Sequence, residues 1–135
     1  MSRSITFHIR TEHPMQMIHL TDKIQQLVRE SNIKSGLCII FIPHTTAAVT
    51  INENADPDVV DDFLMEMNKI VPLRDGYRHS EGNSAAHIKA SMMGFSETII
   101  IEDGKLLLGT WQGIYFMEFD GPRNRKVQIK ILEES

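Results

Sequence analysis

Residues 47–70 read AAVTINENADPDVVDDFLMEMNKI, and the fold prediction depends on the change from strand to helix within this stretch. The short apolar run 47–51 is rich in β-branched residues, which is typical of a buried strand. Asp56 then stands before Pro57, so a capping carboxylate precedes a proline that fits the first turn of a helix. Apolar residues recur at helical spacing from there to Ile70. A buried strand followed by a helix is therefore expected.

The residues before this stretch predict strands on either side of another helix. Residues 5–10 alternate between apolar and polar side chains, as a half-buried strand does. Residues 21–32 have apolar side chains at helical spacing, with Thr21 as N-cap and Gly36 as the stop. A continuous apolar run over 37–42 predicts a second buried strand.

The residues after it predict a short helix and a set of antiparallel strands. The helix covers 84–93 and is closed by Gly94, and Asp103-Gly104 forms a hairpin turn. The expected strands are 98–101, 105–108, 114–119 and 127–132. We expect these strands to form a meander. The predicted fold is α+β: a single compact domain over 1–135, a mainly antiparallel sheet or sandwich with two to three helices packed on it.

Composition excludes several classes of function. The chain has 135 residues, with 14 Lys and Arg against 18 Asp and Glu, so its net charge of -4 argues against nucleic acid as a partner. The single cysteine, Cys38, lies in an apolar run and makes no internal disulfide. No apolar stretch approaches the length of a membrane span, and the start shows no signal-peptide pattern. We expect a soluble, cytoplasmic protein without membrane contact.

Three of the six histidines stand on separate predicted elements. His44 follows a buried strand, His79 lies in a polar loop, and His87 lies on the short helix after that loop. Dispersed histidines of this kind are common ligands of catalytic zinc. The alternative is that they are partly buried histidines with structural partners. His8, His13 and His19 are interpreted as ordinary solvated residues.

Two other stretches are candidates for a ligand pocket. Asn52 and Glu53 lie where a strand gives way to a helix, and Glu53 suits a general base or a partner that orients a liganding histidine. Turn formation and helix capping are the alternative. The second stretch is Gly109-Thr110-Trp111-Gln112-Gly113. Its two glycines indicate a bulge or a close approach of the backbone to a ligand. The alternative is a hairpin in which the indole of Trp111 lies in the core.

Local positive charge suggests where an anion would bind. Lys89 and Arg123 belong to two groups of basic residues, which either hold phosphate or carboxylate or form a solvated face. The chain has no phosphate loop, no dinucleotide fingerprint and no serine-hydrolase elbow. The enzyme classes that depend on those motifs are excluded.

Five motifs, in this order, give the chain a resemblance to the YjbQ family. They are His44-Thr45-Thr46-Ala47-Ala48, Asn52-Glu53-Asn54-Ala55-Asp56-Pro57, Tyr77-Arg78-His79, Asn83-Ser84-Ala85-Ala86-His87-Ile88-Lys89 and Gly109-Thr110-Trp111-Gln112-Gly113-Ile114. The resemblance implies an α+β homotrimer and a metal bound by His44, His79 and His87. It also implies a secondary thiamine-phosphate synthase, which joins a pyrimidine diphosphate to a thiazole phosphate. Some relatives have a longer acidic segment where this chain has Ser80-Glu81-Gly82.

The predicted site follows from the residues and the resemblance together. Zinc is the expected metal, with magnesium as the alternative for a diphosphate substrate, and a small phosphorylated molecule is the expected ligand. Asn52 and Glu53 are the predicted catalytic residues. The predicted substrate contacts are Lys89, Thr110, Trp111, Gln112 and Arg123. Two other functions stay open: a metal-dependent hydrolase in which Glu53 takes a proton from water, and a ligand-binding protein without catalysis.

Overall fold

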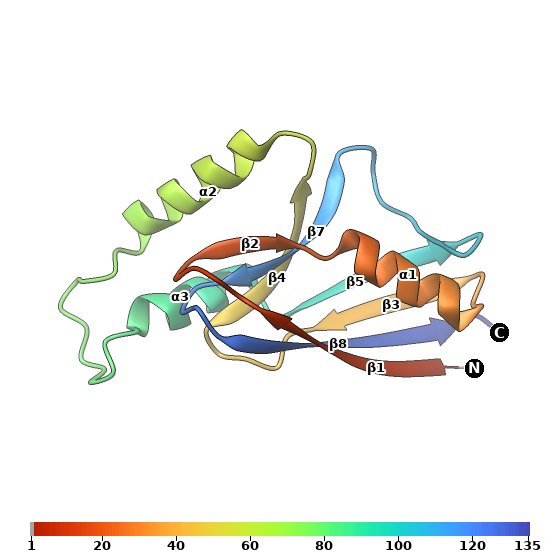
Figure 1. The fold of residues 1–135 in the computed structure, drawn as a ribbon, viewed down its shortest axis with the longest axis horizontal. Coiled ribbons are helices and arrows are strands. Elements are labelled where there is room, and N and C mark those ends of the chain that lie inside the picture. Colours follow the sequence, from red (N-terminus) through yellow and green to blue (C-terminus); the bar gives the residue numbers. More distant parts are fainter. Residues whose placement is uncertain (1) are drawn as a thin grey trace.

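Two antiparallel sheets and three helices make up residues 2–135, the part of the chain that the structure, a computed structural model, describes. The elements in chain order are β1 (Ser2–Arg10), β2 (Gln16–His19), α1 (Thr21–Ser31), β3 (Gly36–Phe41), β4 (Ala47–Glu53), α2 (Pro57–Ile70), α3 (Ser84–Met93), β5 (Ser96–Glu102), β6 (Lys105–Leu106), β7 (Gln112–Glu118) and β8 (Asn124–Glu133) (Figure 1). This arrangement confirms the α+β prediction.

The elements stack in layers around two apolar cores. A five-stranded sheet has the order β1-β8-β3-β5-β6, and a three-stranded sheet has the order β2-β7-β4. The main core lies between them and includes the apolar face of α1, with Ile24 and Val28 fully buried. On the other face of the three-stranded sheet, α3 packs through Ala86 and Ala90, and α2 packs through Val60 and Phe63. The outer face of the five-stranded sheet has no helix on it within residues 2–135.

The predicted helices are confirmed, although two of their end signals were wrong. The helix α3 spans 84–93 as predicted, and Asp56 caps α2 by accepting a hydrogen bond from the Asp58 N–H at 2.9 Å. The capping position of α1 is Leu20, while the Thr21 hydroxyl accepts from the Ile114 N–H at 2.9 Å. This helix stops at Asn32, which is left-handed with φ of 59°, and Gly36 begins β3 instead.

The predicted C-terminal meander is wrong. The hairpin at Asp103-Gly104 is confirmed, with φ of 51° and 72° at its two central residues. The next strand, β7, then joins the other sheet between β2 and β4, and β8 returns to lie between β1 and β3. The burial patterns of β7 and β8 explain why these two strands lie in different sheets. All residues 113–118 of β7 are buried because both faces of this strand are covered, whereas β8 alternates between buried and exposed residues.

Two further sequence predictions can be compared directly with the structure. Cys38 is fully buried and makes no disulfide, and burial raises the pKa of its thiol to about 12. Among residues 2–135, no helix combines the length and the apolar character that crossing a membrane requires.

Candidate functional site

Two of the three predicted metal-ligating histidines lie together. His79, in the loop between α2 and α3, and His87, on α3, have ring centroids 5.6 Å apart and meet edge to face. They share an open hollow of about 450 Å³ whose other lining residues are Tyr77, Arg78, Ser84 and Ile88. The Tyr77 hydroxyl donates to the Pro72 carbonyl oxygen at 2.7 Å, which holds the loop in place. Two adjacent imidazoles supply half of the ligands of a tetrahedral zinc ion.

The third histidine, His44, has a different environment. It is half-buried after β3, and its Nε2 accepts a hydrogen bond from the backbone N–H of Lys126 at 2.9 Å. Within residues 2–135, no three His, Cys, Asp or Glu side chains lie close enough to hold one metal ion. A single chain therefore presents a histidine pair and a separate histidine.

A buried ion pair lies beside His44. Arg125 donates from Nε to one carboxylate oxygen of Glu118 at 2.9 Å and from its terminal nitrogen to the other, and the two side chains are 5% and 0% exposed. The same nitrogen donates to the Thr46 hydroxyl at 2.9 Å, and the Thr11 hydroxyl donates to Glu118 at 2.7 Å. The backbone N–H of Asp120 also donates to Glu118, at 3.1 Å. Both charges are therefore well satisfied.

The polar network continues from the ion pair to the helix that carries His87. The Asp120 carboxylate accepts from Arg123 at 2.8 Å and from the Asn83 amide nitrogen at 2.8 Å. Asn83 occupies the N-cap position of α3, and its Oδ1 is buried and accepts no hydrogen bond within residues 2–135. One connected set of groups thus positions both the segment of His44 and the start of α3.

The ion pair also shifts pKa values. Burial and then the positive charge of Arg125 lower the pKa of His44 below 6.5, so its imidazole is neutral at pH 7, as a metal ligand must be. Burial by itself raises the pKa of Glu118, but the hydrogen bonds from Arg125, Thr11 and Asp120 outweigh it and the net direction is down. Glu118 is consequently ionised at neutral pH.

The predicted catalytic residues lie at the opposite end of β4 from His44. Asn52 and Glu53 pair with Gly113 and Gln112 of β7. A strand of this length spans about 20 Å, so these two residues are far from His44. Within residues 2–135, Glu53 makes no hydrogen bond to a histidine. Its carboxylate instead accepts from the Ala55 N–H at 3.3 Å. The catalytic role of both residues stays a prediction, and within one chain they do not join His44.

The predicted loop 109–113 is neither a hairpin nor the place of a core indole. The strands on either side of it belong to different sheets, and Trp111 is 63% exposed. A Cβ on Gly113 would lie 2.6 Å from that of Asn54, so the close approach at this glycine is to the chain itself. Thr110, Trp111 and Gln112 are exposed, and their contact with a substrate stays a prediction.

The two predicted anion contacts differ in exposure. Arg123 is half-exposed and forms an ion pair with Asp120. Lys89 is 3% exposed. Its Nζ donates to Oδ1 of the Asn68 side chain at 2.8 Å and to the Met15 sulfur at 3.3 Å, so it joins α3 to α2. Burial lowers the pKa of Lys89. Anion binding by Lys89 stays a prediction, and it would require Nζ to leave Asn68.

The sequence analysis gives no role to Glu118 or Asp120, and it includes Thr46 and Asn83 only as members of the family motifs. A signal for Glu118 was present, because it is the one charged residue in the predicted strand 114–119. A carboxylate in such a run is almost never fully buried unless it is paired. That rule would have prompted a search for its partner.

The ion pair yields a prediction about stability. Glu118→Gln leaves the Arg125 charge buried without a counter-charge, so we expect a loss of about 3–5 kcal/mol in the free energy of unfolding. The double variant Glu118→Gln/Arg125→Met should recover part of this loss. As a matched control, Arg123→Gln removes the exposed pair with Asp120 and should cost at most about 1 kcal/mol. Urea denaturation measures all three, and equal costs for Glu118→Gln and Arg123→Gln would contradict the assignment.

The lowered pKa of His44 predicts a pH dependence. In metal-free protein the unfolded chain takes up a proton near pH 6.5 that the folded chain resists, so stability falls as the pH drops below about 6.5. His44→Gln should flatten this part of the stability curve. The stability that is lost when Glu118 takes up a proton is lost at lower pH, because the pKa of Glu118 is lowered. His8→Gln, which changes an exposed histidine, should leave the curve unchanged. An identical curve for His44→Gln and the wild type would refute the prediction.

Comparisons with known proteins identify the family. The model of the family described as UPF0047 protein YjbQ-like matches residues 5–134. UPF0047 protein MJ1081 of Methanocaldococcus jannaschii is 49% identical, over 93% of this chain and 91% of that protein. UPF0047 protein YugU of Bacillus subtilis is also 49% identical, over 94% of this chain and 97% of that protein.

Solved structures confirm the fold. A YjbQ/UPF0047 protein of Clostridium acetobutylicum superposes with a TM-score of 0.93 at 55% identity, covering 95% of this chain and 99% of that one. A YbjQ-like protein of Sulfolobus solfataricus gives a TM-score of 0.95 at 31% identity and covers 99% of both chains. The chain therefore belongs to the YjbQ-like UPF0047 family.

Proposed function

We propose that the protein binds a divalent metal ion between copies of itself, with His79 and His87 from one chain and His44 from another. The observation that carries this proposal is the histidine pair, whose ring centroids lie 5.6 Å apart beside an open hollow. Among residues 2–135, no third His, Cys, Asp or Glu side chain lies close enough to complete a metal site with them. Imidazoles are preferred ligands of zinc, and three of them leave one position open. A homotrimer, as the resemblance implies, has room for such shared sites between neighbours.

The reaction that fits this proposal is the formation of thiamine phosphate as a secondary activity. The thiazole nitrogen attacks the methylene carbon of the pyrimidine diphosphate, a carbon–nitrogen bond forms, and the bond to the diphosphate oxygen breaks. A bound zinc or magnesium ion would supply positive charge for the leaving diphosphate. Arg78, which lines the hollow, and the half-exposed Arg123 supply guanidinium groups that suit phosphate oxygens.

The remaining predicted site residues enter this proposal from a neighbouring copy. Asn52 and Glu53 lie at the far end of β4 from His44, next to the exposed loop with Thr110, Trp111 and Gln112. A neighbour would bring these groups to the substrate, where the indole face suits an aromatic ring.

The small phosphorylated substrates and the reduced, buried thiol of Cys38 agree with a cytoplasmic location.

Metal content tests the shared histidine site. Elemental analysis of untagged protein should find close to one zinc ion per chain, and His44→Ala, His79→Ala and His87→Ala should each lose most of it. His8→Ala and His13→Ala change exposed histidines and serve as controls that should keep the metal. Circular dichroism checks that each variant folds. Wild-type protein that stays metal-free after incubation with zinc, manganese and magnesium would refute the site.

The synthase activity is tested at Arg123. Because its guanidinium would offset charge on the diphosphate, Arg123→Ala should form thiamine phosphate at least about tenfold more slowly, a loss of about 1.4 kcal/mol in transition-state stabilisation. Arg29→Ala on α1 is the matched control, since Arg29 is exposed on a helix that carries no predicted site residue. Unchanged turnover in folded Arg123→Ala would contradict the role. Zinc binding without turnover in the wild type would favour a hydrolase or a ligand-binding protein instead.

A further inference from the structure

A second hollow adjoins the one at the histidines. It has a volume of about 320 Å³, and we call it the loop hollow because the loop between α2 and α3 lines it. The side chains around it belong to Leu73, Arg74, Asp75, Tyr77 and His79. Tyr77 and His79 also line the hollow of about 450 Å³ that contains His87, which we call the histidine hollow. The two hollows therefore meet at these two residues.

Hydrogen bonds hold the loop that forms the loop hollow. The Tyr77 hydroxyl donates to the Pro72 carbonyl oxygen at 2.7 Å, and the Gly82 N–H donates to the His79 carbonyl oxygen at 3.2 Å. Gly76 and Gly82 also line the hollow, with φ of 71° and 77°. A Cβ on either glycine would meet no atom within 4 Å, so the space beside their backbone is open to a ligand.

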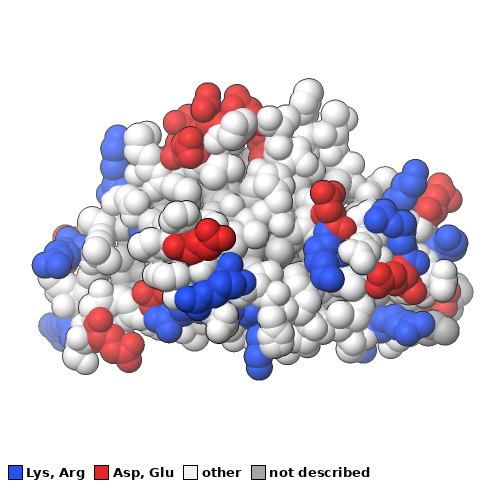
Figure 2. All heavy atoms as spheres, in the orientation of Figure 1, with Lys and Arg blue, Asp and Glu red and all other residues white. Residues whose placement is uncertain are grey.

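The two hollows differ in charge. The loop hollow has a guanidinium from Arg74 and a carboxylate from Asp75, whereas the described residues that line the histidine hollow include Arg78 and no acidic residue. Glu81 of the same loop lines neither hollow. The end of the molecule where Figure 1 places the loop carries charges of both signs in Figure 2. A diphosphate is therefore favoured in the histidine hollow and is repelled by Asp75 in the loop hollow.

The walls of the loop hollow suit a flat ring with polar edges. Leu73 is 62% exposed, and its apolar side chain lines the hollow together with the rings of Tyr77 and His79. Sites for small molecules combine such walls with a few polar groups that fix the orientation of the ligand. The Asp75 carboxylate accepts hydrogen bonds from an amino group, and the Arg74 guanidinium donates to a ring nitrogen that has a free lone pair. An amino-substituted nitrogen heterocycle presents both groups.

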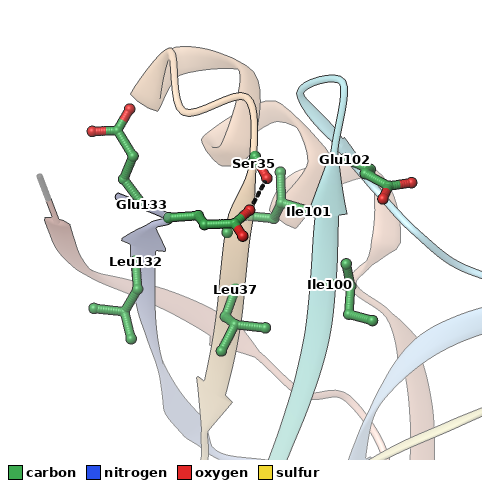
Figure 3. A pocket seen from close by; sticks show the side chains of 9 residues that line it. Ser35, Leu37, Ile100, Ile101, Glu102, Leu132 and Glu133 are labelled. Carbon is green, nitrogen blue, oxygen red and sulfur yellow. Dashed lines mark hydrogen bonds between the residues drawn. The ribbon is translucent and has the colours of Figure 1, made fainter.

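The larger hollow on the five-stranded sheet does not have this character. Its volume is about 480 Å³, and Figure 3 shows Leu37, Ile100 and Leu132 side by side across three neighbouring strands. Within residues 2–135, its lining contains no Lys, Arg or His, and its charged members are Glu102, Glu133 and Glu134. A phosphorylated molecule is therefore repelled there, although the space is larger.

We propose that the loop hollow binds an aminopyrimidine ring, so that the pyrimidine diphosphate lies across both hollows. The ring lies beside Asp75 and Arg74, and the diphosphate lies beside Arg78 in the histidine hollow. The methylene carbon between ring and diphosphate then lies near Tyr77 and His79, where the hollows meet. The choice of a pyrimidine rests on the proposed function, whereas the binding of an amino-bearing heterocycle at Asp75 requires neither metal nor turnover.

Calorimetric titration with the aminopyrimidine alcohol, the pyrimidine half without phosphate, tests the loop hollow. With EDTA present, the wild type should bind this probe, and Asp75→Asn should bind it at least about tenfold more weakly because a charged hydrogen-bond acceptor is lost. Asp61→Asn is the matched control, since Asp61 is an exposed carboxylate on α2 that lines neither hollow. No saturable binding by the wild type, or equal binding by Asp75→Asn, would overturn the proposal.

Inorganic diphosphate with magnesium tests the orientation. Arg78→Gln should weaken the binding of diphosphate and keep the binding of the aminopyrimidine alcohol, whereas Asp75→Asn should keep the binding of diphosphate. A loss of both probes in Asp75→Asn would show that Asp75 only maintains the loop, and it would overturn the assignment. Diphosphate binding that does not change in Arg78→Gln would overturn the placement of the diphosphate.

These titrations separate the failure of this inference from the failure of the proposed function. Aminopyrimidine binding that depends on Asp75, in a protein that takes up no metal and forms no thiamine phosphate, would support the loop hollow and refute the synthase. Thiamine-phosphate formation with the same KM for the pyrimidine diphosphate in Asp75→Asn and the wild type would support the synthase and overturn the loop hollow.

Discussion

The buried ion pair between Glu118 and Arg125 is the interaction on which the arrangement of this chain depends. It joins the end of β7 to the start of β8, which belong to different sheets, and it also binds Thr46 and Thr11, which lie before β4 and after β1. A buried pair of this kind adds little net stability relative to an apolar replacement, because removing both charges from water is costly. The pair connects four chain segments, and an arrangement that separated the partners would leave a charge buried without a counter-charge.

The placement of the histidines follows from that network. The segment before β4 carries His44, and Asp120, whose N–H donates to Glu118, accepts from Asn83 at the start of α3. The helix α3 in turn presents His87 toward His79. The network thus fixes the segment of His44 and the start of α3 within one chain, and the proposed metal site would need a second copy to bring His44 to the pair of His79 and His87.

Local patterns in the sequence were sufficient for the elements but not for their partners. The Asp56-Pro57 cap and the helical spacing that follows it located α2 to the residue, because capping and amphipathicity are properties of neighbouring residues. Strand pairing is not a property of neighbouring residues. The sequence therefore predicts β7 and β8 in one meander, although they lie in two sheets. The four residues of β2 were too few to show a period. For the site, residue types identified three histidines, whereas bringing His79 and His87 together required the loop and α3 in three dimensions. A site shared between copies, as proposed here, would lie beyond any pattern within one chain.

The most direct test of this account is a crystal structure of the zinc-loaded protein, with anomalous diffraction recorded on both sides of the zinc absorption edge. The proposed metal site predicts one anomalous peak per chain, bound by His79 and His87 of one copy and by His44 of a neighbouring copy. An anomalous peak with all its protein ligands from one chain, or none at these histidines, would contradict it.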